Sequence, residues 1–498
     1  MKYSPKVLRT NLLALACLAA CPAAYAAHVD ASLLAPGAGE SDALLVFPSS
    51  TQALTPLASD ADYKLRRRAL VDSLRAHADA TQRDVRAWLD ANGIPYRSYW
   101  IANVIQARLP RTAIAVLASR NDVLRIEPNP SIPMNLPQHQ AVEAPSVPDT
   151  ISWGVTKINA PLVWAAGYNG QGVVIAGEDT GYQWDHPALQ PHYRGWDGSN
   201  ADHNYNWHDA IHDSTGNPCG NDSPFPCDDF GHGTHTAGTF AGDDGGSHQT
   251  GVAPGAKWIG CRNMDDGNGT PARYIECMEW MLAPTDLNGQ NPNPDLAPDV
   301  VSNSWGCIPS EGCTVGDEIE GAVNDVVAGG IFFAVAAANN GPACETITDP
   351  PAIYDASFVV GATDTGDHIA GFSSRGPVVA STLIRPDLSA PGVNVPSAWP
   401  PNTYQNLSGT SMATPHVAGT AALVMSVNPA LKGHPDEVGA ILRATTVTQG
   451  VTDPSNSGCG GLTMADWPNY QAGYGRLDAY AAVVVADTLF ADGFESAP

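Results

Sequence analysis

The stretch GVVIAGEDTG, Gly172 to Gly181, sets an apolar run directly before an acidic pair. Strands buried on both faces of a sheet have this near-continuous apolar character, whereas a strand with one solvated face alternates apolar and polar residues. Similar runs follow at 257–261, 299–304, 331–338 and 358–362. Helical patterns lie among them, for example at 271–282 and 315–327. From residue 153 onward, the sequence therefore predicts an α/β fold with a mostly parallel sheet flanked by helices.

Charge is distributed unevenly along the chain. The whole sequence has 25 Lys and Arg against 51 Asp and Glu, a net charge of −26. Residues 1–150 hold 15 of these cations and 13 of the acids, so nearly all of the excess negative charge lies in the remainder. An acidic surface argues against a nucleic-acid partner, because nucleic acids are bound by basic patches. The asymmetry also predicts two segments with separate roles.

The N-terminus has the pattern of a secretion signal. A basic start precedes the apolar run Leu12–Ala20, and the small residues Ala24-Tyr25-Ala26 follow at cleavage spacing. We therefore expect residues 1–27 to be removed and the protein to be secreted. An alternative is a lipid anchor, because LAAC ending at Cys21 resembles the lipobox of bacterial lipoproteins. No other stretch is apolar enough to predict a transmembrane segment.

Eight cysteines follow the signal, and an even number in an exported chain favours disulfides over a metal cluster. The complete pairing cannot be derived from sequence. Short separations predict two local pairs, Cys219–Cys227 and Cys307–Cys313. No CxxC pair occurs, which argues against a zinc ribbon.

The front segment has the pattern of a small independent unit. Its expected elements are a strand at 43–47, one long helix at 64–92, two strands within 96–109, a helix at 112–119 and a strand at 123–126. This β-α-β-β-α-β order is typical of a small α+β, ferredoxin-like sandwich. Proline-rich sequence at 128–148 predicts an exposed linker. The expected divisions are a signal at 1–27, the front segment at 28–145, the α/β domain at 146–487 and a C-terminal tail at 488–498.

The stretch SGTSMATPHVAG, Ser408 to Gly419, raises the question of what Ser411 does. A serine at this place can simply begin a helix. A serine nucleophile instead requires a histidine base and a carboxylate that orients it. DDFGHGTHTAGT supplies His232 between two glycines, and Asp179 ends the predicted strand, where ligand crevices form in open α/β sheets. The order Asp, His, Ser and the absence of GxSxG around Ser411 exclude an α/β-hydrolase.

These motifs resemble the subtilisin-like serine proteases over about residues 150 to 485. GVAPGAKWIGC and FSSRGP are most similar to the bacillopeptidase F-like branch of that family. The resemblance implies a secreted serine endopeptidase made as a zymogen. In that enzyme Asp179 orients the imidazole, His232 acts as general base and then general acid, and Ser411 forms an acyl-enzyme. Two alternatives stay open: an inactive protease fold that binds a partner, and an esterase with the same triad.

The resemblance also assigns the oxyanion site and a strand that binds substrate. FFAVAAANNGP offers Asn339 as the oxyanion donor, with Asn340 adjacent and Ala338 where the family usually has glycine. Substrate would pair with Ser304-Trp305-Gly306 as an added strand. Trp305 either helps to wall a pocket for an apolar side chain or packs in the core. By spacing, Asp349 falls near the floor of the primary pocket, where it could favour a basic residue.

The front segment corresponds, by this resemblance, to a pro-segment that templates folding, inhibits the enzyme within the same chain and is cut off within 128–150. Its Arg-rich helix, with Lys64 and Arg66–Arg68, would complement the acidic body. The alternative is a permanent accessory domain. Protein or peptide substrates are the expected partners, and we expect a monomer.

No cofactor is required for this chemistry, and metal ligands are not assigned. Structural calcium stays open, although one family site takes an acid where this chain has Ala188. HDAIH, with His208 and His212, has metal-ligand spacing, and His186, His192 and His203 lie nearby. It lacks the glutamate of HExxH, so a solvated loop is the favoured interpretation.

Overall fold

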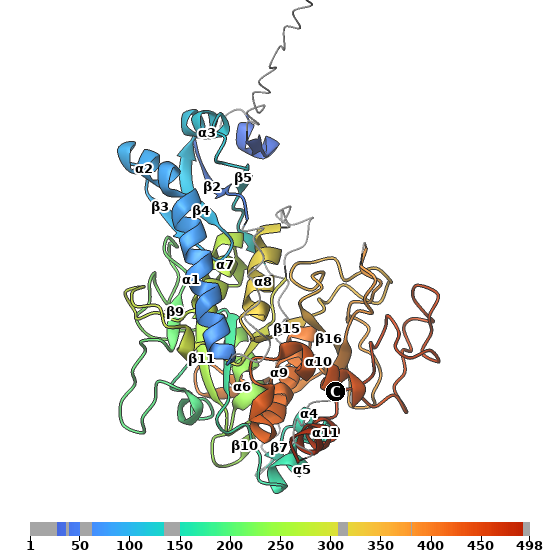
Figure 1. The fold of residues 1–498 in the computed structure, drawn as a ribbon. Coiled ribbons are helices and arrows are strands. Elements are labelled where there is room, and N and C mark those ends of the chain that lie inside the picture. Colours follow the sequence, from blue (N-terminus) through green and yellow to red (C-terminus); the bar gives the residue numbers. More distant parts are fainter. Residues whose placement is uncertain are drawn as a thin grey trace, which may run out of the picture.

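The computed structural model describes residues 27–35, 39–49, 62–133, 150–306, 317–379 and 381–491. A small N-terminal sheet with its helices stands on a larger α/β body (Figure 1). The predicted signal with Cys21, most of the predicted linker, and the predicted Cys307–Cys313 pair lie outside the described residues.

A seven-stranded sheet forms the centre of the body, in the order β17-β16-β15-β14-β8-β11-β9. Every neighbouring pair in it is parallel. In chain order its strands are β8 (Val174–Asp179), β9 (Trp207–Asp209), β11 (Lys257–Arg262), β14 (Val300–Asn303), β15 (Phe332–Ala336), β16 (Phe358–Thr363) and β17 (Leu388–Pro391). The apolar runs of the sequence coincide with five of them. The α/β prediction is confirmed.

Helices cover both faces of this sheet, which explains why its strands are apolar throughout. Along β14, Val300 packs into the core formed with α6 (His232–Ala241) and α9 (Thr410–Val427). The next residue, Val301, packs into the opposite core with α7 (Pro271–Leu282) and α8 (Asp317–Ala328). Four further helices are α4 (Trp153–Lys157), α5 (Ala160–Ala165), α10 (Pro435–Ala444) and α11 (Ala479–Ala491). The first residues of the predicted tail thus belong to α11.

Short strands and 3₁₀ turns complete the body. The strands are β6 (Ile132–Pro133), β7 (Thr150–Ile151), β10 (His248–Gln249), β12 (Met264–Asp265), β13 (Asn268–Gly269), β18 (Val395–Trp399) and β19 (Thr403–Leu407). The 3₁₀ turns include η2 (Gln190–His192), η3 (Pro294–Leu296) and η5 (Pro429–Leu431).

The N-terminal unit has the expected β-α-β-β-α-β order plus one added strand. Its sheet runs β1-β5-β2-β4-β3, with β1 (His28–Val29), β2 (Glu40–Val46), β3 (Tyr96–Tyr99), β4 (Val104–Pro110) and β5 (Arg125–Pro128). The helices are η1 (Ala31–Leu34), α1 (Tyr63–Thr81), α2 (Arg83–Ala91) and α3 (Arg111–Ala118).

The prediction of one helix over 64–92 is wrong, because the chain bends at Gln82 between α1 and α2. The Gln82 side chain is fully buried, and its Nε2 donates to Asn103 Oδ1 at 2.9 Å and to the Tyr99 carbonyl at 3.3 Å. These bonds reach residues about 20 positions away, so helical periodicity carries no signal for the bend.

Arginines of α1 attach the N-terminal unit to the body, along the side of the body seen in Figure 1. Arg67 is 1% exposed, and its Nε donates to the Gly329 carbonyl at 2.7 Å. Arg68 pairs with Asp295, and Arg66 donates to the Gly433 carbonyl at 3.1 Å. The expected contact between the basic helix and the body is therefore present.

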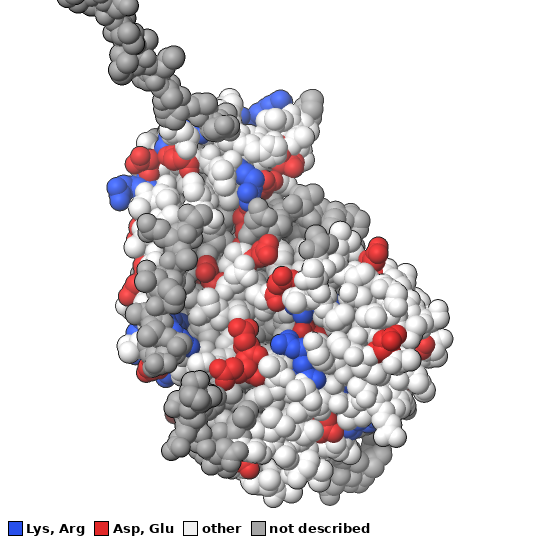
Figure 2. Space-filling model, turned by 45° about the vertical axis from the view of Figure 1, so that its right-hand side comes forward, with Lys and Arg blue, Asp and Glu red and all other residues white. Residues whose placement is uncertain are grey.

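Carboxylates are spread over the face of the body in Figure 2, and basic side chains are fewer there. This distribution agrees with the acidic composition of the chain. Among the helices that the structure describes, none combines the length and the hydropathy needed to cross a membrane.

Candidate active site

The structure joins two of the predicted catalytic residues directly. Asp179 is the last residue of β8 and His232 is the first of α6; both are almost fully buried. Asp179 Oδ1 lies 2.7 Å from His232 Nδ1 and also accepts the backbone N–H of Thr180 at 2.7 Å. His232 Nε2 is buried and has no hydrogen-bond partner among the described residues. The imidazole is thus oriented at one nitrogen and available as a base at the other.

Two glycines allow this pair to form. Gly231 has φ +102°, and a Cβ there would lie within 2.8 Å of three Trp399 ring atoms. A Cβ at position 233 would lie 2.1 Å from the Gly181 carbonyl oxygen and 3.0 Å from Asp179 Cβ. On either side of His232 the backbone therefore leaves no room for a side chain: the Trp399 ring fills the space at 231, and the end of β8 with the turn after it fills the space at 233.

Ser411 occupies the first turn of α9, the helix that packs against α6 (Figure 1). Its Oγ donates to the Ser304 carbonyl at 3.4 Å, and the Ser304 hydroxyl donates to the Ser411 carbonyl at 3.1 Å. This reciprocal contact fixes the serine against the segment that follows β14. The helix N-terminus adds a positive field at the place where an oxyanion would develop.

Asn339 lies beside the same helix start, after the end of β15. Its Oδ1 accepts both the backbone N–H and the hydroxyl of Thr410, at 2.9 and 3.0 Å. With Oδ1 occupied, the amide Nδ2 is the end that remains to donate to a substrate oxygen. Asn340 instead directs its Nδ2 to Asp349, 3.4 Å away. The geometry therefore favours Asn339 over Asn340 as the oxyanion donor.

Ala338 has φ +74°, the left-handed region that glycine adopts at much lower cost. We expect Ala338→Gly to raise the free energy of unfolding by about 0.5–1 kcal/mol. Relief of the left-handed conformation is worth about 1–2 kcal/mol, and the larger entropy of the unfolded glycine chain offsets about 0.4–1 kcal/mol of it. Urea unfolding of a Ser411→Ala background, which avoids self-digestion, measures the difference.

The neighbouring substitution Ala337→Gly is the matched control for Ala338→Gly. Ala337 is fully buried and is not among the residues with positive φ, so glycine there should destabilise the protein. A loss of stability in both variants would show that backbone strain at Ala338 is not relieved by glycine.

The substrate-binding segment predicted at Ser304-Trp305-Gly306 directly follows β14, beside Ser411. The Trp305 ring is 2% exposed and stacks on Tyr274 with ring centroids 3.8 Å apart. The ring thus packs in the core, which was the alternative interpretation. Pairing of this backbone with substrate stays a prediction.

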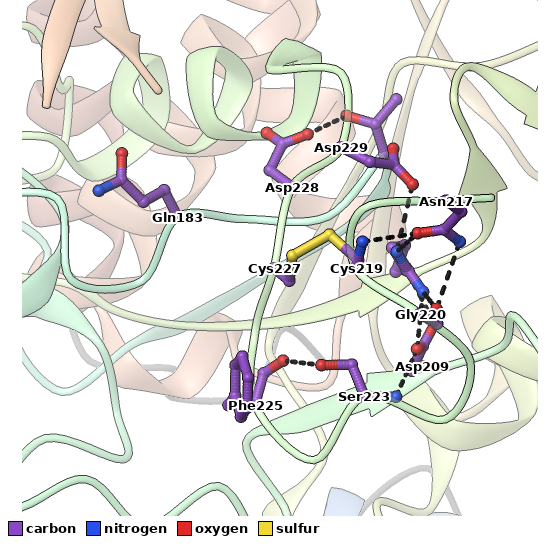
Figure 3. Close-up of a disulfide and its surroundings, with 12 residues drawn as sticks. Gln183, Asp209, Asn217, Cys219, Gly220, Ser223, Phe225, Cys227, Asp228 and Asp229 are labelled. Carbon is purple, nitrogen blue, oxygen red and sulfur yellow. Dashed lines mark hydrogen bonds and ion pairs between the residues drawn. A yellow bond between two sulfur atoms is a disulfide. The ribbon is translucent and has the colours of Figure 1, made fainter. Parts of the chain in front are cut away.

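Asp228 is a residue of the site that the motifs did not single out. It directly follows the Cys219–Cys227 disulfide, one of the two local pairs predicted from spacing (Figure 3). Its Oδ1 accepts the Gly231 N–H at 2.7 Å and the Thr180 hydroxyl at 2.9 Å, while Oδ2 accepts the Thr234 N–H at 2.9 Å. Asp228 thus ties the start of α6 to the end of β8.

Further cross-links surround the site. Cys261–Cys277 joins β11 to α7, and Cys344–Cys459 joins the segment after Asn339 to the C-terminal part of the body. Beside the Cys219–Cys227 disulfide, Arg262 pairs with Asp209 at 2.8 Å and with Asp229 at 3.2 Å. These bonds hold the loops before α6 and after β15 in place.

The HDAIH histidines come together at α7, away from the catalytic pair. His208 Nε2 and His212 Nε2 lie 2.8 and 2.9 Å from Glu276 Oε1, and Tyr99 of the N-terminal unit donates to Glu276 Oε2 at 2.8 Å. Burial opposes ionisation of Glu276, but these histidines outweigh it and hold its pKa well below the usual range. The structure engages the cluster in hydrogen bonds, so the solvated-loop interpretation is wrong. Within the described residues, no His, Cys, Asp or Glu cluster qualifies as a metal site.

The remaining histidines of that prediction are separate from the cluster. His186 and His192 bind the carbonyls of Thr403 and Asp243, at 3.0 and 3.1 Å. His203 contacts the Tyr193 hydroxyl at 3.0 Å. Ala188, the position of the expected family calcium ligand, is fully buried.

The comparisons with known proteins agree on one family for this chain. A family model described as the subtilase family matches residues 170–464. The chain is 38% identical to bacillopeptidase F of Bacillus subtilis (strain 168) over 445 residues, which cover 85% of this chain and 29% of that protein. It is 35% identical to serine protease AprX of the same organism over 321 residues, or 59% of this chain and 65% of that protein.

A third relative is covered to a larger share of its own length. The alkaline protease of Alkalihalobacillus alcalophilus is 32% identical over 317 residues, which cover 64% of this chain and 70% of that protein. The chain thus spans less than a third of bacillopeptidase F and just under two thirds of AprX.

Proposed function

Because this chain belongs to the subtilase family, as its motifs predicted, we propose that it is a secreted serine endopeptidase, made as a zymogen. Asp179, His232 and Ser411 carry out the hydrolysis of the peptide bond. The observation that carries the proposal is the buried 2.7 Å contact between Asp179 and His232, beside α9, whose first turn holds Ser411. The names of the relatives support the same reaction class.

In the proposed reaction, His232 Nε2 takes the Ser411 Oγ proton as Oγ attacks the peptide carbonyl carbon. Asn339 Nδ2 and the Ser411 backbone N–H stabilise the resulting oxyanion. His232 then gives its proton to the leaving amine, and the acyl-enzyme remains on Ser411. Water, deprotonated by His232, releases the acid product and restores the serine. Asp179 holds His232 in position and stabilises its protonated form.

The N-terminal unit is proposed to be the pro-segment that inhibits the enzyme within the same chain, and its contacts with α7 and α8 support a unit docked on the body. Glu279 of α7 accepts the backbone N–H groups of Trp100 and Ile101, at 2.5 and 3.0 Å. Arg125 of β5 pairs with Glu318 of α8, and the Asn129 side chain accepts the Ala272 N–H at 3.0 Å. The N-terminal unit therefore covers the ends of α7 and α8.

Glu279 predicts how pH affects this docking. Burial raises its pKa to about 8 from an ordinary value of 4.5. If the exposed group returns towards 4.5 once the pro-segment leaves, docking takes up a proton between these values. The Kd of the pro-segment should then rise with pH from about 5 to 8, at most about tenfold per pH unit.

Inhibition of the processed enzyme by added pro-segment, measured at several pH values, tests this sign. Glu279→Gln should flatten the dependence, because the amide does not titrate. The matched control is Glu437→Gln at the start of α10, since Glu437 is exposed and lies on another helix. A Kd that falls as pH rises, or an unchanged slope in Glu279→Gln, would contradict the assignment.

The two rival functions differ in observable ways. An inactive binding protein would take up no fluorophosphonate probe, although folded and processed. An esterase would label at Ser411 but would turn over ester substrates without cleaving matched peptides. Intact mass before and after the probe, followed by competition between a peptide and its ester, separates all three. A folded protein in which the probe does not label Ser411 would overturn the proposed function.

A further inference from the structure

Asp349 is a buried carboxylate near the proposed oxyanion donor. It is 4% exposed, and among the described residues no Lys or Arg forms an ion pair with it. Its partners are neutral: the Thr348 hydroxyl donates to Oδ1 at 2.6 Å, and Asn340 Nδ2 donates to Oδ2 at 3.4 Å. Burial raises the pKa of Asp349 in spite of both hydrogen bonds. A buried acid without a counter-charge destabilises the fold and is more typical of a functional site.

Asp349 lies between the two segments that contact the start of α9. A Cβ built on Gly306 would be 3.5 Å from Asp349 Cβ and 3.8 Å from Oδ2, ordinary van der Waals distances. Gly306 lies two residues after Ser304, which is bonded to Ser411. On the other side, Asn340 follows Asn339, which is bonded to Thr410. A side chain that lies along Gly306 therefore meets the Asp349 carboxylate.

The hydrogen bonds of Asp349 do not explain why it is an acid. An asparagine could place its carbonyl oxygen at Oδ2 for Asn340 and its amide nitrogen at Oδ1 for the Thr348 oxygen. Among the described residues, no neighbour therefore requires the negative charge of Asp349. Oδ2 has only the longer contact, of 3.4 Å, and it is the oxygen that faces Gly306.

We propose that Asp349 selects substrates with Lys or Arg on the acyl side of the cleaved bond. The long apolar stem of either residue would lie along Gly306, and its cation would reach Oδ2 of Asp349. Because the pair forms out of water, it discriminates strongly against neutral side chains of the same shape. This inference rests on the proposed function and adds its substrate class.

Matched fluorogenic peptides test the charge alone. One pair carries arginine or its neutral isostere citrulline before the cleaved bond, and a second carries lysine or norleucine. With enzyme processed from the full chain, we expect kcat/KM to favour the charged member on the order of 100-fold. Asp349→Asn should bring both ratios close to one. The matched control, Asp355→Asn, removes an exposed charge six positions away and should keep the ratios.

Active-site titration with a fluorophosphonate accompanies every rate, so that only folded and reactive enzyme is counted. If Ser411 takes up no probe, the proposed function fails before specificity is addressed. If the enzyme labels fully but shows no preference for the cationic peptides, the role of Asp349 is overturned and the protease assignment stands. An equal ratio in wild type and Asp349→Asn overturns it as well.

Discussion

Ser411→Ala is expected to lower peptide turnover by about 10⁶-fold, the loss that is typical when the nucleophile of such a triad is removed. The alanine keeps the helix start, because neither the Thr410–Asn339 contacts nor the Ser304 hydroxyl bond to the residue 411 carbonyl uses Oγ. The fold should therefore survive while the reaction stops. kcat/KM on a peptide substrate and intact mass after a fluorophosphonate measure the two effects.

The same variant reports on maturation. If the pro-segment is cut off by the enzyme's own triad, Ser411→Ala should retain residues 28–145, whereas the wild type should start within 128–150. Ser426→Ala is the matched control, since it makes the same change on α9 in a hydroxyl that only donates to the Leu423 carbonyl. A Ser411→Ala protein that still hydrolyses peptides would contradict the nucleophile assignment. Normal processing of that variant would instead point to a separate processing protease.

Local sequence was sufficient to predict the regular part of the fold. The helix at 271–282 was predicted with the bounds that α7 has, because its apolar spacing is a local signal. In the structure Thr270 caps its start by accepting the Arg273 N–H. Five of the seven strands of the parallel sheet were equally visible as short apolar runs, whereas β9 and β17 were not. Long-range features could not be predicted from local sequence, because the bend at Gln82 and the stacking of Trp305 on Tyr274 depend on partners distant in sequence.

The residues of the proposed site also divide into those that local sequence indicates and those that it does not. Asp179, His232 and Ser411 stand out because each is surrounded by glycine or other small residues, and the structure explains this for His232 through the close approach of Gly233 to Gly181. Asp228 had no such signature, although it binds the start of α6 through several hydrogen bonds. Cys219–Cys227 followed from its short separation, whereas Cys344–Cys459 spans 115 residues and could not be inferred from spacing.

Asp179→Ala is expected to lower kcat by about 10⁴-fold, because His232 loses both its orientation and the charge that stabilises its protonated form. Asp179→Asn should be less damaging here. Oδ1 accepts two N–H groups, from Thr180 and from His232, so the asparagine carbonyl is held in that position and its NH₂ is turned away. His232 then keeps its Nδ1 proton and loses only the negative charge, which should cost about 10²–10³-fold.

Comparing the two variants separates orientation from charge at His232, the proposed general base. kcat for the two variants, each corrected by fluorophosphonate titration, gives the difference directly. Equal losses would mean that the asparagine NH₂ faces His232 and forces the wrong tautomer, in spite of the Thr180 N–H. A loss below tenfold in both variants would remove Asp179 from the proposed triad altogether. Thr236 Oγ1 lies 3.4 Å from Asp179 Oδ2. If the Thr180 backbone N–H alone holds the asparagine carbonyl in place, adding Thr236→Val to Asp179→Asn should lower kcat little further.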